Sequence, residues 1–510
     1  MAKSIMLQGT SSHVGKSILT TALCRIFLQD GYRVVPFKAQ NMALNSYVTK
    51  TGGEMGRAQV AQAEAAGLAP MVEMNPVLLK PTGNSRSQVV VMGRPVGNMS
   101  AAEYHAGYSL KALGIVKECL QKLSDDFEVV VIEGAGSPAE VNLKANDIVN
   151  MRVAKMITAP VLLIADIDRG GALASVVGTL ELLEPDEREL VKGIIINKFR
   201  GDIKLLEPAL TFLEQKTGKP VVGVIPHLSD LGIDDEDSVS LDDKSSRSTG
   251  EIDIAVLRIP KISNFTDFDA LGREPDVSVR YVRQGEIIGN PDLIVLPGSK
   301  NTTEDLLYLR EQGFEQEILK LVAGGTPIIG ICGGYQMLGQ HIHDPEQTES
   351  EYGSIAGLGL IDTETTFAAE KITHQVTAGC SAHSFIGMNY SGQHLTGYEI
   401  HMGRTEFLKT AEPSFIITSR SGTGIVAEDG VVRSDGLVMG TYIHGIFDND
   451  EYRRSLINAL RVKKELEPLP ITTGDSLDRK EAAYDRLAAT VRENLDMDLI
   501  YKVMGLKVKA

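Results

Sequence analysis

The chain has 510 residues, 43% hydrophobic and 23% charged, which is a globular composition long enough for two or three domains. Its formal net charge of −16 argues against a nucleic-acid surface, which requires basic patches, and gives no support to binding of anionic membranes. There is no basic start followed by a long apolar core, the apolar runs have only strand length, and the four cysteines are widely spaced. These features predict a cytoplasmic protein without disulfide bonds.

A glycine-rich loop follows the first apolar run. Residues 9–17, Gly-Thr-Ser-Ser-His-Val-Gly-Lys-Ser, stand between a short strand pattern and a helical one. The N–H groups of such a loop and the positive end of the next helix bind polyphosphate oxygens. An exposed lysine on a Gly/Ser turn is the alternative. We predict that ATP binds here, with Lys16 on the β- and γ-phosphates and Ser17 on magnesium. The predicted loop contacts are Gly9, Thr10, Gly15, Lys16 and Ser17.

Apolar runs of strand length alternate with helical patterns through the first half of the chain. They cover residues 4–8, 33–37, 128–132, 161–165, 191–197 and 221–225. This alternation predicts an α/β domain with a doubly wound, mostly parallel sheet. Its binding sites then lie at the carboxyl ends of the strands.

Polar residues follow several of these runs. Lys38, Gln40 and Asn41 come after the second and are candidates for holding a substrate carboxylate or a transferring phosphoryl group; a solvated loop lysine is the alternative. Glu133, after the third, takes the place of a second magnesium ligand. Asn197 can read an adenine edge. Further carboxylates, each individually a cap or a solvated charge by default, complete the candidate substrate site: Asp147 and Asp166.

The chain changes character at residues 229–250, which are polar, acidic and without helical periodicity. This composition predicts a linker between an ATP-dependent domain at 1–228 and a second domain at 251–450. Residues 451–510 look helical and charged, so we expect a helical extension with a packing or oligomer role. The sequence leaves open whether the chain forms a homo-oligomer.

A cysteine lies between a buried strand pattern and a helix in the second half. Residues 327–339 read Pro-Ile-Ile-Gly-Ile-Cys-Gly-Gly-Tyr-Gln-Met-Leu-Gly. The small residues around Cys332 permit the sharp turn of a nucleophile elbow, where a helix N-terminus favours a thiolate. The N–H of Gly333 and one from the Gly298 loop could form an oxyanion hole. A buried structural thiol is the alternative for Cys332 taken alone.

A thiol nucleophile needs a base, and His444 is the best candidate among ten histidines because it follows a strand-like run. We expect a binding or interface role for His401. His341 and His343 are closely spaced, but no nearby cysteine or carboxylate pattern supports a metal site, so we expect surface histidines.

Gly-Ile-Cys-Gly-Gly-Tyr-Gln at 330–336 resembles the nucleophile motif of class I glutamine amidotransferases, and the five-residue spacing of the first loop resembles the dethiobiotin synthetase-like branch of P-loop proteins. Further motifs together resemble the cobyric acid synthase family, from the N-terminus to about residue 450. These motifs are residues 8–12, 36–42, 75–81, 133–140 and 398–403.

The resemblance implies an amidoligase of cobalamin biosynthesis that uses ATP, magnesium and glutamine. Its corrinoid substrate would be adenosylcobyrinic acid a,c-diamide, amidated at the b, d, e and g carboxylates to give adenosylcobyric acid. Cys332 would attack glutamine, His444 would be its base and Gln336 would help to seat the glutamine. Lys16 and Ser17 match the phosphate and magnesium positions, and Glu133 matches a second magnesium ligand.

One position departs from general class I glutaminases. Many of these have a glutamate two residues after the histidine, where this chain has Ile446. We expect Asp448 or a backbone carbonyl to orient His444, unless the site works as a dyad. The rival functions are a cobyrinic acid a,c-diamide synthase, a P-loop switch ATPase, and a cysteine hydrolase with a regulatory ATP domain.

Overall fold

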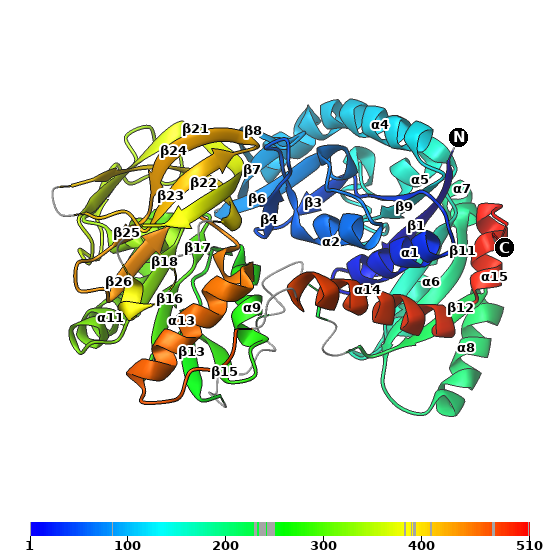
Figure 1. Ribbon diagram of the computed structural model, residues 1–510. Coiled ribbons are helices and arrows are strands. Elements are labelled where there is room, and N and C mark those ends of the chain that lie inside the picture. The colour runs from blue at the N-terminus through cyan, green and yellow to red at the C-terminus, as the bar shows by residue number, and fades with distance from the viewer. Residues whose placement is uncertain are drawn as a thin grey trace.

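A computed structural model shows two α/β units side by side (Figure 1). It describes residues 2–83, 85–228, 232–233, 241, 250–381, 384–388, 390, 394–408, 411–471, 475–507 and 509, without the side chains of 475–477. The predicted linker at 229–250 lies outside the described residues, apart from 232, 233, 241 and 250.

Six parallel strands form the central sheet of the first unit, in the order β12-β11-β10-β1-β9-β2. The predicted doubly wound sheet is therefore confirmed, and each of the six apolar runs is one of its strands. Their bounds are β1 (Lys3–Gly9), β2 (Val34–Phe37), β9 (Val129–Glu133), β10 (Val161–Asp166), β11 (Val191–Phe199) and β12 (Val221–Pro226).

Helices cover both faces of this sheet because alternate residues of each strand point to opposite sides. On β1, Ile5 and Leu7 belong to the core under α1 (Lys16–Gln29), α14 (Asp475–Asn494) and α15 (Met497–Met504). Met6 belongs to the opposite core, under α4 (Ser109–Asp126) and α6 (Ala172–Leu182). The continuous apolar composition of the strand reflects burial on both faces.

A smaller sheet, which we did not predict, projects from the first unit towards the second (Figure 1). Its order is β3-β6-β7-β8, with a separate β4–β5 pair beside it. Asn98 on β8 donates to the Thr348 carbonyl, and Asn301 donates to the Thr82 carbonyl, each over 3.3 Å. These strands therefore connect the two units. Their bounds are β3 (Gln40–Met42), β4 (Ser46–Val48), β5 (Glu54–Gly56), β6 (Val77–Gly83), β7 (Arg86–Val91) and β8 (Arg94–Ser100).

The second unit has its own central sheet, in the order β15-β13-β16-β18-β26-β25, parallel except for the last pair. A second sheet, which contains the long antiparallel pair β21 (Thr363–Cys380) and β22 (Leu395–Phe407), lies against it. The predicted second α/β domain is confirmed. The central strands are β13 (Ile252–Leu257), β15 (Val277–Val282), β16 (Leu293–Leu296), β18 (Ile328–Ile331), β25 (Val431–Val432) and β26 (Val438–Thr441).

The C-terminal helices divide between the two units. Helix α13 (Asp450–Lys463) packs Tyr452 and Leu456 into the core of the second unit. Helices α14 and α15 return to the first, where Asp485 accepts from Arg25 over 2.7 Å. The residues predicted as one extension thus complete two different cores. In the described part of the chain, no helix is both long and apolar enough to cross a bilayer.

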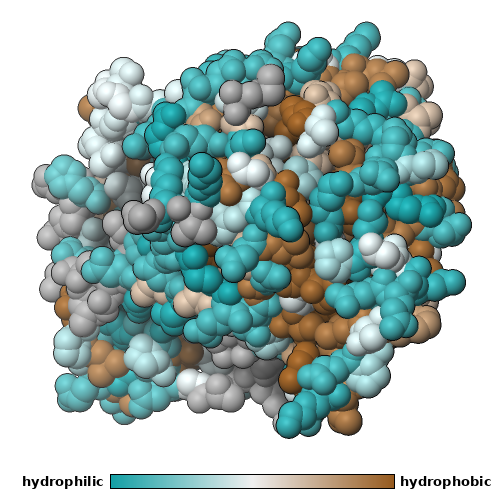
Figure 2. Space-filling view, turned by 90° about the vertical axis from the view of Figure 1, so that its right-hand side faces the viewer, coloured by the Kyte–Doolittle hydropathy of each residue, from teal (hydrophilic) through white to brown (hydrophobic). Residues whose placement is uncertain are grey.

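Exposed apolar side chains occur on the side of the first unit that carries α6 and α8 (Ile203–Thr217). Figure 2 shows this side, where apolar surface lies among charged residues. The exposed side chains on these helices are Leu182, Ile203, Leu205 and Phe212. Such a surface is compatible with a homo-oligomer, which stays a prediction.

Candidate active sites

The turn at Cys332 has the geometry of a nucleophile elbow. Cys332 connects β18 to helix α12 (Gly333–Leu338) with φ 51° and ψ −107°, a strained conformation. A Cβ on Gly334 would lie 2.0 Å from the Leu296 carbonyl oxygen, and one on Gly330 would lie 2.6 Å from Gly334. The turn is therefore this sharp only because the positions two residues before and two residues after Cys332 are both glycine.

His444 lies beside Cys332, as predicted. The strand β26 ends at Thr441, and an isolated antiparallel bridge to Tyr398 then positions His444. The two side chains line the same pocket, and the interaction with Cys332 contributes to the raised pKa of His444. The geometry thus brings a thiol and an imidazole together from distant parts of the chain.

Asp267 orients His444, so the expectation of Asp448 or a backbone carbonyl was wrong. Nδ1 of His444 lies 2.6 Å from Oδ2 of Asp267, and both side chains are at most 5% exposed. Burial alone lowers the pKa of His444, but the Asp267 carboxylate and the interaction with Cys332 raise it to about 10. The arrangement is a Cys-His-Asp triad.

Asp267 was missed because it precedes His444 by 177 residues, so its side chain reaches the imidazole only in space. It lies in Asn264-Phe265-Thr266-Asp267-Phe268, just after β14 (Ile262–Ser263). A buried carboxylate between two buried phenylalanines requires a specific partner. That charged residue in an apolar turn was the available signal.

The predicted oxyanion-hole loops lie next to each other. A Cβ on Gly333 would lie 2.7 Å from the backbone N of Ser299, and one on Gly298 would lie 3.4 Å from Cε1 of His444. Asp305 holds this loop by accepting from the Ser299 hydroxyl over 2.6 Å. Burial, partly offset by that hydrogen bond, raises the pKa of Asp305 to about 7.

Gln336 and His401 line the same pocket as Cys332. The Oε1 of Gln336 accepts from Thr302 over 3.0 Å, and its Nε2 donates to the Tyr442 hydroxyl over 3.1 Å. His401 stacks on Tyr442 with ring centroids 3.7 Å apart, and burial lowers its pKa. His401 thus belongs to the pocket wall, close to the reactive pair.

The phosphate-binding loop joins β1 to α1 in the predicted strand-loop-helix context. Gly15 has φ 97°, and a Cβ there would lie 2.2 Å from Nδ2 of Asn197. Asn197 donates to the Val14 carbonyl over 2.7 Å. The Nζ of Lys16 donates to the carbonyls of Ser11 and Gly136, over 3.0 and 3.1 Å. Asn197 therefore supports the loop, whatever further role its amide has towards adenine.

Glu133 is the centre of the polar groups at this end of the sheet. Its carboxylate is buried and accepts from Ser17 and Lys38, each over 2.8 Å, and from Gln62 over 2.5 Å. The folded chain thus brings together three of the predicted residues. A serine hydroxyl beside a carboxylate is a donor set that magnesium accepts together with phosphate oxygens and water.

Magnesium at this site would depend on the nucleotide. Among the described residues, no group of three His, Cys, Asp or Glu side chains is arranged to hold a metal ion. Ser17 and Glu133 supply only two protein ligands, so phosphate oxygens and water would have to complete the shell.

The remaining candidates surround this centre at varying distance. Asn41 donates to Gln59, which lies 3.5 Å from Glu133, whereas Gln40 accepts from Tyr104. Asp166 pairs with Lys198 over 2.8 Å, and Lys198 also donates to the carbonyl of His13 in the phosphate loop.

The hydrogen-bond partners of Asp147 lie in its own loop and do not include Glu133. Asp147 accepts from the backbone of Val149 and Asn150, and Asn150 donates to the Ala135 carbonyl over 2.7 Å. Burial raises the pKa of Asp147. In this structure Asp147 shapes the loop behind the phosphate site.

His341 and His343 stack on each other, and each lies within 3.4 Å of a Glu364 carboxylate oxygen. Both rings are at least partly exposed. The described residues hold no metal-binding group at this place.

Each unit matches one family description. The CobQ/CobB/MinD/ParA nucleotide binding domain matches residues 5–240, and the CobB/CobQ-like glutamine amidotransferase domain matches residues 253–452. Among solved structures, PurLQS from Thermotoga maritima aligns with 17% identity and a TM-score of 0.31, over 46% of this chain and 99% of that one.

Curated relatives match over nearly the full length. A cobyric acid synthase of Pelotomaculum thermopropionicum is 57% identical over 99% of this chain and 97% of its own. One of Desulforamulus reducens is 56% identical over 99% of both chains. One of Moorella thermoacetica is 57% identical over 99% of this chain and 98% of its own.

Proposed function

Because the chain belongs to the cobyric acid synthase family, we propose that it converts adenosylcobyrinic acid a,c-diamide into adenosylcobyric acid. The b, d, e and g carboxylates would each be amidated at the expense of one glutamine and one ATP. The observation that carries the proposal is the full-length similarity to cobyric acid synthases, in a chain whose two units each hold a compatible site.

In the glutaminase unit, the thiol proton of Cys332 passes to His444, and the sulfur attacks the γ-amide carbon of glutamine. The tetrahedral oxyanion lies towards the N–H groups of Gly333 and the Gly298–Ser299 loop. His444 gives a proton to the departing nitrogen, the C–N bond breaks, and ammonia leaves. Water, deprotonated by His444, then hydrolyses the thioester to glutamate. Asp267 supports both steps because it stabilises the imidazolium and fixes the ring.

In the ATP-dependent unit, a substrate carboxylate oxygen attacks the γ-phosphorus of ATP and ADP leaves. Lys16 binds the transferred phosphoryl group. Lys38, whose Nζ lies 2.8 Å from Glu133, is placed to neutralise negative charge on the phosphoryl group during transfer. Magnesium, held by Ser17 and Glu133, would supply charge neutralisation on the phosphates. Ammonia then attacks the acyl phosphate carbon, and phosphate leaves with formation of the amide.

Mass spectrometry of the corrinoid products tests this proposal. The protein is incubated with adenosylcobyrinic acid a,c-diamide, ATP, magnesium and either glutamine or ammonia, with Cys332→Ala as the matched variant. Four stepwise amidations are expected. In the variant they are lost with glutamine and restored by ammonia.

Other outcomes point to the rival functions. An untouched diamide, together with two amidations of cobyrinic acid, would assign the chain to cobyrinic acid a,c-diamide synthases. ATP hydrolysis without any amidation would favour a P-loop switch ATPase, although such a switch has no use for a Cys-His-Asp triad. Location in the cytoplasm stays a prediction, supported by four unpaired cysteines.

A further inference from the structure

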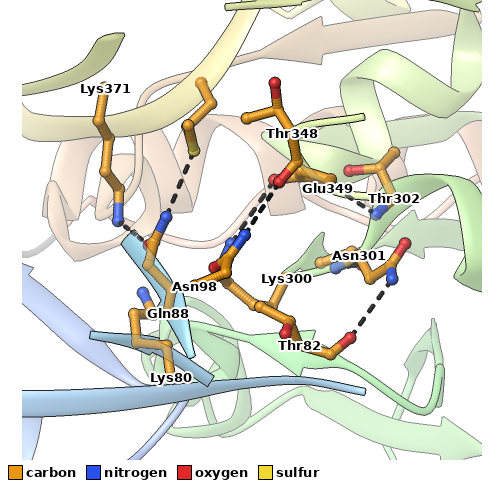
Figure 3. A network of polar contacts seen from close by, with 12 residues as sticks. Lys80, Thr82, Gln88, Asn98, Lys300, Asn301, Thr302, Thr348, Glu349 and Lys371 are labelled. Atoms are coloured by element: carbon orange, nitrogen blue, oxygen red, sulfur yellow. Dashed lines mark hydrogen bonds and ion pairs between the residues drawn. The ribbon is translucent and has the colours of Figure 1, made fainter. Parts of the chain in front are cut away.

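Five charged side chains form a cluster beside the glutaminase pocket, which we term the ion cluster: Glu54, Lys80, Lys300, Glu349 and Lys371. The three lysines and Glu349 line the same pocket as Cys332 and His444. Each of the five side chains is at most 8% exposed. Figure 3 shows Lys80, Lys300, Glu349 and Lys371 within a network of polar contacts. The chemistry described above uses none of them.

The cluster combines residues of both units. Glu54 on β5 and Lys80 on β6 belong to the ATP-dependent unit, and the other three belong to the glutaminase unit. Lys80 and Lys371 each lie 2.6 Å from a Glu54 oxygen, so this carboxylate is bound from both sides. Lys300 and Glu349 are 3.7 Å apart, a looser contact. Lys300 and Glu349 therefore form the weakest ion pair of the cluster and are the best placed to contact a ligand.

The charges of the cluster do not balance. Three ammonium groups face two carboxylates, and buried charge without a partner is costly. Burial lowers the pKa of Lys80 to about 8, against the opposing effect of Glu54, and Lys371 and Lys300 lower it further. The pKa of Lys300 is lowered by burial first and also by Lys371, although Glu349 opposes this. The pocket thus offers lysine ammonium groups to a ligand carboxylate and the Glu349 carboxylate to a ligand ammonium group.

We propose that the ion cluster binds the α-amino acid end of glutamine, with Lys300 and Lys80 on the α-carboxylate and Glu349 on the α-ammonium group. The γ-amide is then directed towards Cys332 in the same pocket. This inference rests on the proposed glutaminase activity. Its consequence is that the ATP-dependent unit, through Lys80 and Glu54, completes the glutamine site of the other unit.

Steady-state ammonia release by the full-length protein tests the inference with three amides. Glutamine carries both α-groups, glutaramic acid lacks the α-ammonium group, and 4-aminobutanamide lacks the α-carboxylate. Glu349→Gln is expected to raise KM for glutamine about 10- to 100-fold and to abolish the preference for glutamine over glutaramic acid. Lys300→Met should likewise raise KM for glutamine about 10- to 100-fold and should abolish the preference for glutamine over 4-aminobutanamide. Lys80→Met should raise KM for glutamine about 10-fold.

Asn98→Ala is the matched control. It removes an uncharged contact between the units, the hydrogen bond to the Thr348 carbonyl, from a residue that does not line the pocket. KM for glutamine should stay within about twofold.

Two results would overturn the inference: an unchanged KM and amide preference in both Glu349→Gln and Lys300→Met, or an equal loss with all three amides, which indicates only a structural role. Because each preference is measured within one variant, either variant suffices if the other does not fold. Ammonia release needs no corrinoid, so a failure of the proposed corrinoid chemistry is recognised separately.

Discussion

The imidazole of His444 is oriented by the carboxylate of Asp267, with Nδ1 and Oδ2 2.6 Å apart. The two residues come from opposite ends of the glutaminase unit, one after β13 and the other after β26. Asp267 also accepts from the backbone N of Gly445 over 3.1 Å. The carboxylate therefore fixes both the ring and the loop that carries it.

Asp267→Asn should reduce kcat for glutamine hydrolysis by about 100-fold or more, because an amide neither stabilises the imidazolium nor enforces its tautomer. Glutamate release measures the effect. Asp448→Asn, which changes one of the alternatives left open by the sequence, is the control and should stay within about twofold of the unchanged protein. Similar losses in both variants would contradict the triad.

The pH profile of glutamine hydrolysis should show the effect of Asp267 on the pKa of His444. The Asp267 carboxylate stabilises the charged imidazole, so the pKa of His444 is raised to about 10 even though burial opposes this. The imidazolium thus persists through neutral pH and is lost as the pH rises through this value. The alkaline limb of kcat/KM should lie well above pH 8 and move to lower pH in Asp267→Asn. An unmoved limb would assign it to another group.

The two active sites should be separable by mutation. Lys16→Ala should abolish amidation with either glutamine or ammonia, because the phosphoryl group loses its lysine, while glutamate release persists. Cys332→Ala should have the complementary effect. Product analysis and glutamate release on the same samples measure both. Loss of glutamate release in Lys16→Ala would instead indicate that nucleotide binding controls the glutaminase.

The buried pair of Lys38 and Glu133 should be visible in the stability of the ATP-dependent unit. Both side chains are at most 5% exposed. Lys38→Met leaves the carboxylate without its lysine and should lower the unfolding free energy by about 3 kcal/mol. The double variant Lys38→Met/Glu133→Gln should recover part of this loss because no charge remains unpaired. Calorimetric unfolding of the three proteins measures the coupling, and purely additive losses would argue against it.

Replacing a glycine of the elbow by alanine should have a very different effect on stability from replacing a glycine whose added Cβ would meet no other atom. Gly334→Ala places a Cβ 2.0 Å from the Leu296 carbonyl oxygen and should prevent correct folding of the second unit. Gly114→Ala on α4 meets nothing within 4 Å and should raise stability by about 0.5–1 kcal/mol, because alanine is the better helix former. Thermal unfolding distinguishes the two, and a folded, active Gly334→Ala protein would contradict the packing argument.

Local sequence patterns were sufficient to predict the strands of the first sheet and those site residues whose neighbours in the sequence define the turn or loop around them. Six apolar runs identified the strands of the first sheet, because a parallel sheet buried on both faces requires continuous apolar sequence. Glycine, lysine and serine identified the phosphate loop, and flanking glycines identified Cys332, because sharp turns exclude larger side chains. Those signals lie within a few residues of each site.

Tertiary structure alone decided which distant groups meet. Asp267 reaches His444, α14 covers the core beneath β1, and Lys80 enters a pocket of the other unit, each through contacts between residues more than 100 positions apart. A charged residue in a short strand or turn looks the same in sequence whether it is solvated or paired. Its role depends on burial and on the charge opposite, and these exist only once the two units are packed together.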